Sequence, residues 1–84
     1  MQQREIEIVS PQGLNAAAST ELTKLTSKYQ CDISLMRNGR RVNAKSLMGV
    51  MMLAAGRGSR VVVETDGPDE TEALSAIVAL IGEA

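Results

Sequence analysis

The stretch that decides the fold is residues 31–43, which read CDISLMRNGRRVN. Its first half alternates, with Cys31, Ile33 and Leu35 on one side of an extended chain, and this period of two is typical of a half-buried strand. Asn38-Gly39 follows directly, and this dipeptide tolerates the positive φ angles of a two-residue type I′ turn. The pattern therefore predicts a hairpin in which residues 40–43 return beside residues 31–37.

The segment before this hairpin predicts a strand and then a helix. In residues 4–10 isoleucine alternates with glutamate, the pattern of a strand, and the Pro-Gln-Gly sequence at 11–13 ends it. Asn15 is a favoured N-cap residue. Apolar side chains then recur at spacings of four, three and four, at Ala18, Leu22, Leu25 and Tyr29. We expect a helix over about residues 16–28.

The segment after the hairpin predicts a helix, a strand and a second helix. Ser46 can cap a short helix over residues 47–53, and the valine-rich residues 60–66 predict a strand. Asp69 and Glu72 have the spacing of a capping box. The inward stripe of the helix that follows them is expected at Leu74, Ile77, Val78 and Ile81. The order β-α-β-β-α-β-α predicts one α+β domain over residues 1–84, with helices covering one face of the sheet.

The residue types that are missing exclude several kinds of chemistry. The chain has no His, one Cys and one aromatic residue, Tyr29. A Ser-His or Cys-His nucleophile pair and a structural zinc site are therefore excluded, and no metal or cofactor is expected. A sheet that stacks several nucleic-acid bases is excluded as well. With Cys31 alone there is no disulfide framework, and no apolar run approaches membrane-spanning length, so we expect a cytoplasmic protein.

The charges are separated along the chain although the formal net charge is only −1. Residues 37–60 contain basic residues and no acidic one, namely Arg37, Arg40, Arg41, Lys45, Arg57 and Arg60. Residues 61–84 contain acidic residues and no basic one. One interpretation is that both blocks are solvated faces. The other is that the basic block receives an acidic partner. The balanced total gives no reason to expect binding to nucleic acid or insertion into a membrane.

Several motifs together carry a family resemblance. The order of elements, the sequence Pro-Gln-Gly-Leu at 11–14, Asn38-Gly39, and residues 43–51, NAKSLMGVM, resemble the HPr family, the histidine-containing phosphocarrier proteins of the bacterial phosphoenolpyruvate-dependent phosphotransferase system. The likeness covers essentially the whole chain. It implies an HPr-like open-faced β-sandwich, a four-stranded antiparallel sheet with three helices on one face. It also implies a carrier or regulatory protein without autonomous catalysis.

The family's active-site motif, Gly-Leu/Ile-His-Ala-Arg-Pro/Ala-Ala/Ser, aligns without gaps on residues 13–19, GLNAAAS. Asn15 stands where the resemblance places the phospho-accepting histidine, and Ala17 stands where it places the assisting arginine. A carboxamide cannot serve as a phosphoryl acceptor under ordinary conditions. We therefore expect both positions to be degenerate. Ser19 and Thr20 lie nearby, but neither has a base to activate it.

The resemblance marks two further features. Ser46 matches the residue that a dedicated HPr kinase phosphorylates in many bacteria, although Ser before an apolar helical run is equally explained as an N-cap alone. Leu47, Met48, Met51 and Met52 resemble the family's exposed apolar docking surface. So dense an apolar run also leaves open that most of these side chains are core. The partner-binding residues expected here are Leu47, Met48 and Met51.

The sequence leaves three functions open. The first is a monomeric protein-binding and regulatory module of the phosphotransferase system, controlled through Ser46 and serving sugar transport or another branch. Its partners would be enzyme I, enzyme IIA-type domains, or HPr kinase and its regulator. The second is a phosphocarrier represented by a site-disabled variant or one that uses another acceptor. The third is a small structural domain without any phosphotransferase partner.

Overall fold

The predicted hairpin is confirmed in the computed structural model, which describes residues 1–83. Strand β2 (Asp32–Arg37) pairs antiparallel with β3 (Arg40–Asn43), and Arg37 lies opposite Arg40. Asn38 and Gly39 have φ angles of 52° and 78°, the left-handed conformation that both central residues of a type I′ turn need. The turn residues therefore set the register of the first strand pair.

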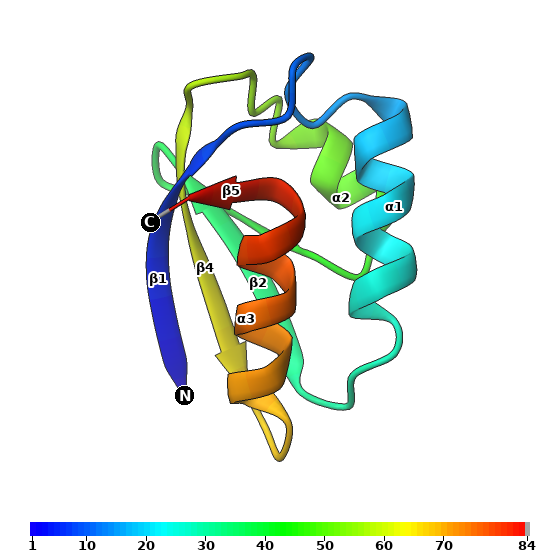
Figure 1. The fold of residues 1–84 in the computed structure, drawn as a ribbon, viewed down its shortest axis with the longest axis vertical. Coiled ribbons are helices and arrows are strands. Elements are labelled where there is room, and N and C mark those ends of the chain that lie inside the picture. Colours follow the sequence, from blue (N-terminus) through cyan, green and yellow to red (C-terminus); the bar gives the residue numbers. More distant parts are fainter. Residues whose placement is uncertain (84) are drawn as a thin grey trace.

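The sheet is antiparallel throughout and runs in the order β3-β2-β4-β1-β5 (Figure 1). Strand β4 (Arg60–Asp66) pairs with both β2 and β1 (Gln2–Ile8). The predicted four strands are confirmed, and a two-residue strand, β5 (Gly82–Glu83), adds to the edge of β1. A Cβ atom on Gly82 would lie 2.8 Å from the Glu7 carbonyl oxygen, a backbone atom of the paired strand, so a glycine is favoured where the chain joins the sheet.

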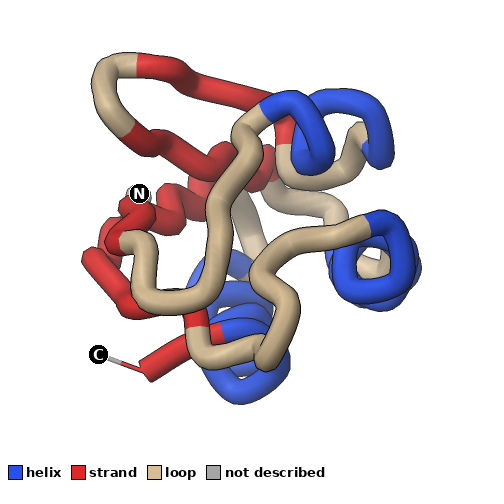
Figure 2. Tube along the Cα trace, turned by 90° about the horizontal axis from the view of Figure 1, so that it is seen from above, coloured by secondary structure: helices blue, strands red, loops and turns tan. Residues whose placement is uncertain are grey.

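Three helices cover one face of this sheet, as predicted: α1 (Ala16–Thr26), α2 (Leu47–Met52) and α3 (Glu70–Ile81). Figure 2 shows the helices on one side of the strand layer. The strands and helices enclose a fully buried aliphatic core that includes Ile6, Ile8, Leu22, Leu35, Val50, Val61, Val63, Ile77 and Ile81. The other face of the sheet is open.

The buried face of α1 differs from the predicted stripe. Leu22 is fully buried, but Ala18, Leu25 and Tyr29 are only half-buried. Ser19 and Thr26 are buried instead because their hydroxyl groups find buried acceptors: Ser19 donates to the Leu14 carbonyl at 3.1 Å, and Thr26 donates to the Ala44 carbonyl at 2.9 Å. The helix also ends two residues before the predicted position, and β1 lies two residues earlier than predicted.

The capping box predicted at the start of α3 is wrong. Asp69 is the N-cap residue by position, but its side chain makes no capping hydrogen bond. Its two carboxylate oxygens instead accept the backbone N–H groups of Gln30 and Cys31, each at 2.9 Å. The carboxylate thus fastens the connection between α1 and β2 to the start of α3. The predicted inward stripe of α3 is confirmed, with Val78 partly exposed at its edge.

Candidate functional site

The loop that leads into α1 is held by a close contact between two backbones. Gly13 has a φ angle of +67°, and a Cβ atom there would lie 2.6 Å from Gly56 Cα and 2.7 Å from the Ala55 carbonyl oxygen. The next residue, Leu14, donates its N–H to the Ala55 carbonyl at 2.8 Å. Only a glycine at position 13 permits both the backbone angle and the approach. The loop is therefore placed by the segment that follows α2.

Asn15 is the N-cap of α1, as the sequence predicts. Its Oδ1 atom accepts the Ala18 N–H at 2.9 Å, and its Nδ2 atom donates to Gln12 Oε1 at 3.0 Å. Both ends of the carboxamide are thus engaged in ordering the loop and the first turn. The side chain is exposed, so it lies at a surface that a partner can reach.

A hollow of about 350 Å³ lies against this helix start. It is lined by Ser10, Pro11, Gln12, Gly13, Asn15, Ala17 and Ala18, none of which has an ionisable side chain. Ala17 contributes only a methyl group. The hydroxyl group of Ser19 is buried on the Leu14 carbonyl, and Thr20 donates to the Ala16 carbonyl at 2.8 Å. The lining residues therefore offer no base, and the hydroxyl group of Ser10 has none among them to activate it.

Ser46 caps α2, which confirms one of its two predicted roles. Its Oγ atom accepts the Gly49 N–H at 3.1 Å, and the residue is half-buried. The neighbouring Lys45 is turned away, because its Nζ atom donates to the Tyr29 carbonyl at 2.7 Å. Phosphorylation of Ser46 stays a prediction.

The apolar residues of α2 divide sharply between core and solvent. Val50 is fully buried. The exposed fractions of the other side chains are 41% for Leu47, 69% for Met48, 41% for Met51 and 61% for Met52. The alternative that most of these residues are core is therefore wrong, and we call these four exposed residues the α2 patch. Figure 1 shows α2, which carries the patch, beside α1, the helix that begins just after Asn15.

The basic block of residues 37–60 does not form one patch. On the open face, Arg41 pairs with Glu64, and Arg60 pairs with Glu5 at 3.2 Å. Arg40 and Arg37 instead reach the end of α2, where each donates a hydrogen bond to a backbone carbonyl. No local sequence pattern indicates these two contacts, because they join segments more than ten residues apart.

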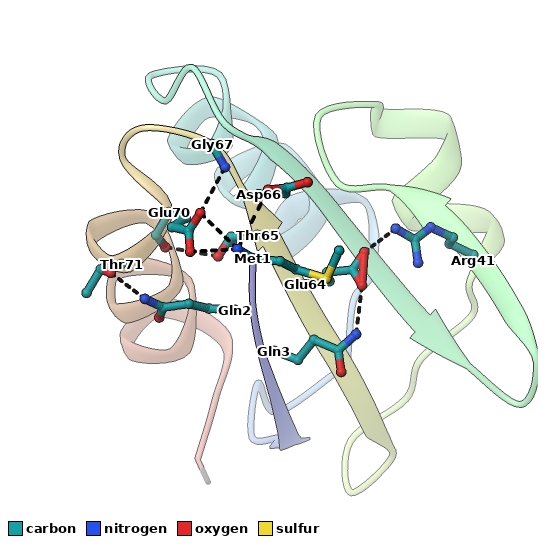
Figure 3. Close-up of polar contacts among 10 residues, drawn as sticks. All are labelled: Met1, Gln2, Gln3, Arg41, Glu64, Thr65, Asp66, Gly67, Glu70 and Thr71. Carbon is teal, nitrogen blue, oxygen red and sulfur yellow. Dashed lines mark hydrogen bonds and ion pairs between the residues drawn. The ribbon is translucent and has the colours of Figure 1, made fainter.

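The open face carries a polar network that the sequence did not predict. Figure 3 shows Glu64 on β4 between Gln3 of β1 and Arg41 of β3. The Glu64 side chain is only 8% exposed. Hydrogen bonds from Arg41 and then from Gln3 hold the pKa of the Glu64 carboxyl below its usual value. All the charges here are paired, so the network is structural.

Glu70 ties the start of β1 to α3. It accepts the Gly67 N–H at 3.1 Å and lies 3.0 Å from the Met1 ammonium group (Figure 3). The Gly67 hydrogen bond, followed by the ammonium group, lowers the pKa of Glu70. This contact fixes the position of the first strand.

Cys31 is a buried structural residue, as expected. It is 1% exposed, and burial, followed by the neighbouring Asp69 carboxylate, raises the pKa of its thiol to about 11. A thiol with so high a pKa is a poor nucleophile at neutral pH. In the part of the chain that the structure describes, His, Cys, Asp and Glu residues do not gather into a group able to hold a metal ion. Among the helices of residues 1–83, none has the length and hydropathy needed to span a membrane.

Comparisons with known proteins agree on one family. The family model PTS-HPr, described as the PTS HPr component phosphorylation site, matches residues 2–83. The chain is 56% identical over 81 residues to the phosphocarrier protein HPr of Cupriavidus necator, an alignment that covers 96% of this chain and 91% of that protein.

Solved structures give the same answer. The phosphocarrier protein HPr of Bacillus anthracis superposes with a TM-score of 0.93 at 35% identity, over 95% of each chain. Crh, the Bacillus subtilis catabolite repression HPr, superposes in its crystal structure with a TM-score of 0.78 at 35% identity, over 95% of this chain and 92% of that one. The fold and the order of elements are therefore shared over almost the full length.

Proposed function

This chain belongs to the HPr family of the phosphotransferase system, whose members are phosphocarrier proteins and not enzymes, and on that premise we propose that it carries no phosphate at position 15 and acts as a protein-binding module of that system. The observation that carries the proposal is the geometry of Asn15. The fold shared with HPr proteins supports a role in binding proteins of that system. The chemistry of residues 15 and 17 supports the loss of phosphoryl transfer.

The chemical argument concerns what a phosphoryl acceptor needs. The acceptor has to be nucleophilic near neutral pH, and an imidazole meets this requirement. The nitrogen lone pair of the Asn15 carboxamide is delocalised into its carbonyl group, and both ends of the group are already hydrogen-bonded. The Ala17 methyl group provides no bidentate donor for a phosphate. Asn15 thus caps the helix but cannot accept a phosphoryl group.

The test is incubation with phosphoenolpyruvate and enzyme I, followed by mass spectrometry of the intact chain. We expect the unaltered chain to gain no phosphoryl group. The double variant Asn15→His with Ala17→Arg should gain one. It restores a phosphoryl acceptor at position 15 and, at position 17, a side chain that donates hydrogen bonds to the phosphate. An acid-labile phosphoryl group on the unaltered chain would contradict the proposal.

The binding role rests on the α2 patch. Methionine side chains adapt to partner surfaces of different shape, and the four exposed apolar residues, which lie one and four positions apart on one short helix, favour contact with a protein. Enzyme I, enzyme IIA-type domains, and HPr kinase with its regulator are the partners we propose. We expect Met48→Ala to weaken binding of enzyme I by about tenfold, the usual size for a central interface side chain. Leu80→Ala is the control, because Leu80 is an exposed apolar residue on α3.

Ser46 is the proposed point of control. A phosphate at a helix start is stabilised by the free N–H groups there, so the modification is compatible with the fold. Incubation with ATP and HPr kinase should label the chain, and Ser46→Ala should abolish the label. Equal labelling of both proteins would remove Ser46 from the proposal.

We propose a monomer that works in the cytoplasm. The crystal structure of the relative Crh is described as a swapped, intertwined dimer. Sedimentation of this chain at micromolar concentration should give a mass near 9.0 kDa, and a stable species of twice that mass would contradict the monomer.

The second candidate function is phosphate carriage, favoured by the 56% identity to a phosphocarrier protein HPr. Under this alternative the chain is a site-disabled variant of a carrier, and no regulatory role follows. The double variant tests this alternative: if it accepts phosphate and passes it on to an enzyme IIA domain while the unaltered chain merely binds, carrier ancestry is favoured and the inert state is due to residues 15 and 17.

A further inference from the structure

The C-terminal end of α2 depends on side chains from another part of the chain. The helix has six residues and contains no basic residue in its last turn. Its final carbonyl groups belong to Met52 and Leu53. Arg40 Nη1 donates to the Met52 carbonyl at 2.8 Å, and Arg37 Nη1 donates to the Leu53 carbonyl at 3.3 Å. These two carbonyls are thus satisfied from outside the helix.

Both arginines come from the tip of the β2–β3 hairpin. They lie opposite each other in the strand register, on either side of the Asn38-Gly39 turn. The guanidinium groups therefore bring two positive charges to the negative end of the helix, which is a favourable placement. Their contacts fasten the hairpin tip to the end of α2, and a hollow of about 200 Å³ lies between the two elements.

Ala54, which follows the C-cap residue Leu53, adds little stability to this end of the helix. Ala54 has a φ angle of 56°, the left-handed conformation that a helix commonly adopts just past its end but that favours glycine over alanine. Its N–H donates to the Met51 carbonyl at 3.2 Å. A helix this short is also marginal by itself. The last turn of α2 therefore gains from hydrogen-bond donors that lie outside the helix.

That same last turn presents Met51 and Met52. Both side chains are exposed and pack little against the core, so their positions follow the backbone of the turn. We propose that Arg37 and Arg40 are positioning residues, which hold the last turn of α2 and thereby set the shape of the α2 patch. The role of the α2 patch in binding rests on the proposed function. The contacts of Arg37 and Arg40 with the end of α2 do not depend on that function.

Amide hydrogen exchange of the whole chain, measured by NMR, tests the hold directly. In Arg40→Ala we expect the N–H groups of Leu53 and Ala54 to exchange about fivefold faster, the usual effect of losing a charge-assisted hydrogen bond at a surface. The Gly49 N–H, at the other end of the helix, should be unaffected. Arg40→Lys keeps a cationic donor and should restore part of the protection.

Arg57→Ala is the matched control, because it removes the same charge from the same basic block, and Arg57 makes no hydrogen bond or ion pair with the described residues. Its exchange rates should equal those of the unaltered chain. Equal rates at Leu53 and Ala54 in Arg40→Ala and Arg57→Ala would overturn the inference.

Binding to enzyme I tests the consequence for the patch. Arg40→Ala should lose more affinity than Arg57→Ala, and Arg40→Lys should recover part of it. Faster exchange in Arg40→Ala with an affinity equal to that of Arg57→Ala would overturn the positioning role. If the unaltered chain does not bind enzyme I, the proposed function fails. The exchange rates in Arg40→Ala, and the chemical shifts of the Met51 and Met52 methyl groups in that variant, still decide whether the arginines hold the last turn.

Discussion

Replacing Gly13 by alanine tests how the loop before Asn15 is held. The φ angle of +67° costs a residue with a Cβ atom about 1–2 kcal/mol. The added atom would also lie 2.6 Å from Gly56 Cα and 2.7 Å from the Ala55 carbonyl oxygen, which are backbone atoms that cannot rotate away. Forced overpacking of this kind costs about 1–3 kcal/mol. We therefore expect Gly13→Ala to destabilise the fold by about 2–5 kcal/mol.

The matched control is Gly39→Ala. Gly39 has a similar φ angle of +78°, but a Cβ atom there would meet nothing within 4 Å. Thermal unfolding followed by circular dichroism should show a fall in Tm of about 4–16 °C for Gly39→Ala and roughly 8–40 °C for Gly13→Ala, at about 4–8 °C per kcal/mol for a domain of this size. The difference between the two variants measures the backbone contact alone. Equal falls in Tm would refute the argument that residues 55–56 hold the loop.

Two further predictions concern stability. Ser46→Ala should lower the free energy of unfolding by about 1 kcal/mol in urea, because Gly49 loses its capping acceptor; an unchanged midpoint would show that the cap is not needed. In the folded chain the pKa values of Glu64, Asp69 and Glu70 lie below their usual values. These carboxylates therefore stabilise the fold at any pH above the unfolded pKa of about 4, and the stabilisation is lost as the pH falls through the lower pKa values of the folded chain. Tm should therefore fall on acidification, and the fall should be smaller in Asp69→Asn; identical pH profiles for the variant and the unaltered chain would contradict the role of Asp69 at Gln30 and Cys31.

Local patterns predicted the elements whose structure depends on neighbouring residues. The Asn38-Gly39 turn, the Asn15 cap and the Ser46 cap each follow from a few adjacent residues, and the structure confirms all three. The valine-rich composition of residues 60–66 likewise predicted a strand, and β4 has these bounds. The family resemblance supplied the sheet arrangement, which the periodicity of single strands does not contain.

The sequence failed where a side chain is used by a distant segment. Asp69 has the right spacing for a capping box, but two backbone N–H groups of the α1–β2 connection use its carboxylate instead. Glu64 sits on the outward side of a strand, a position normally exposed, and it is covered because Gln3 and Arg41 reach it from two other strands. The sequence also leaves open whether Met48 and Met51 are exposed, because a short helix that is apolar on all sides does not show which side faces the core.

Position 15 shows that the structural and the chemical demands on one residue can be separated. The helix start needs an acceptor for the Ala18 N–H, and a carboxamide supplies it as well as any capping side chain does. Phosphoryl transfer needs a nucleophile, which a carboxamide is not. Under the proposed function, Asn15 therefore supplies the cap without the chemistry, next to the loop that the Gly13 contact holds. The double variant should require no repacking, because the exchanged side chains at positions 15 and 17 are exposed. Its Tm should fall by no more than about 4–8 °C, the effect of losing the one cap that Asn15 provides.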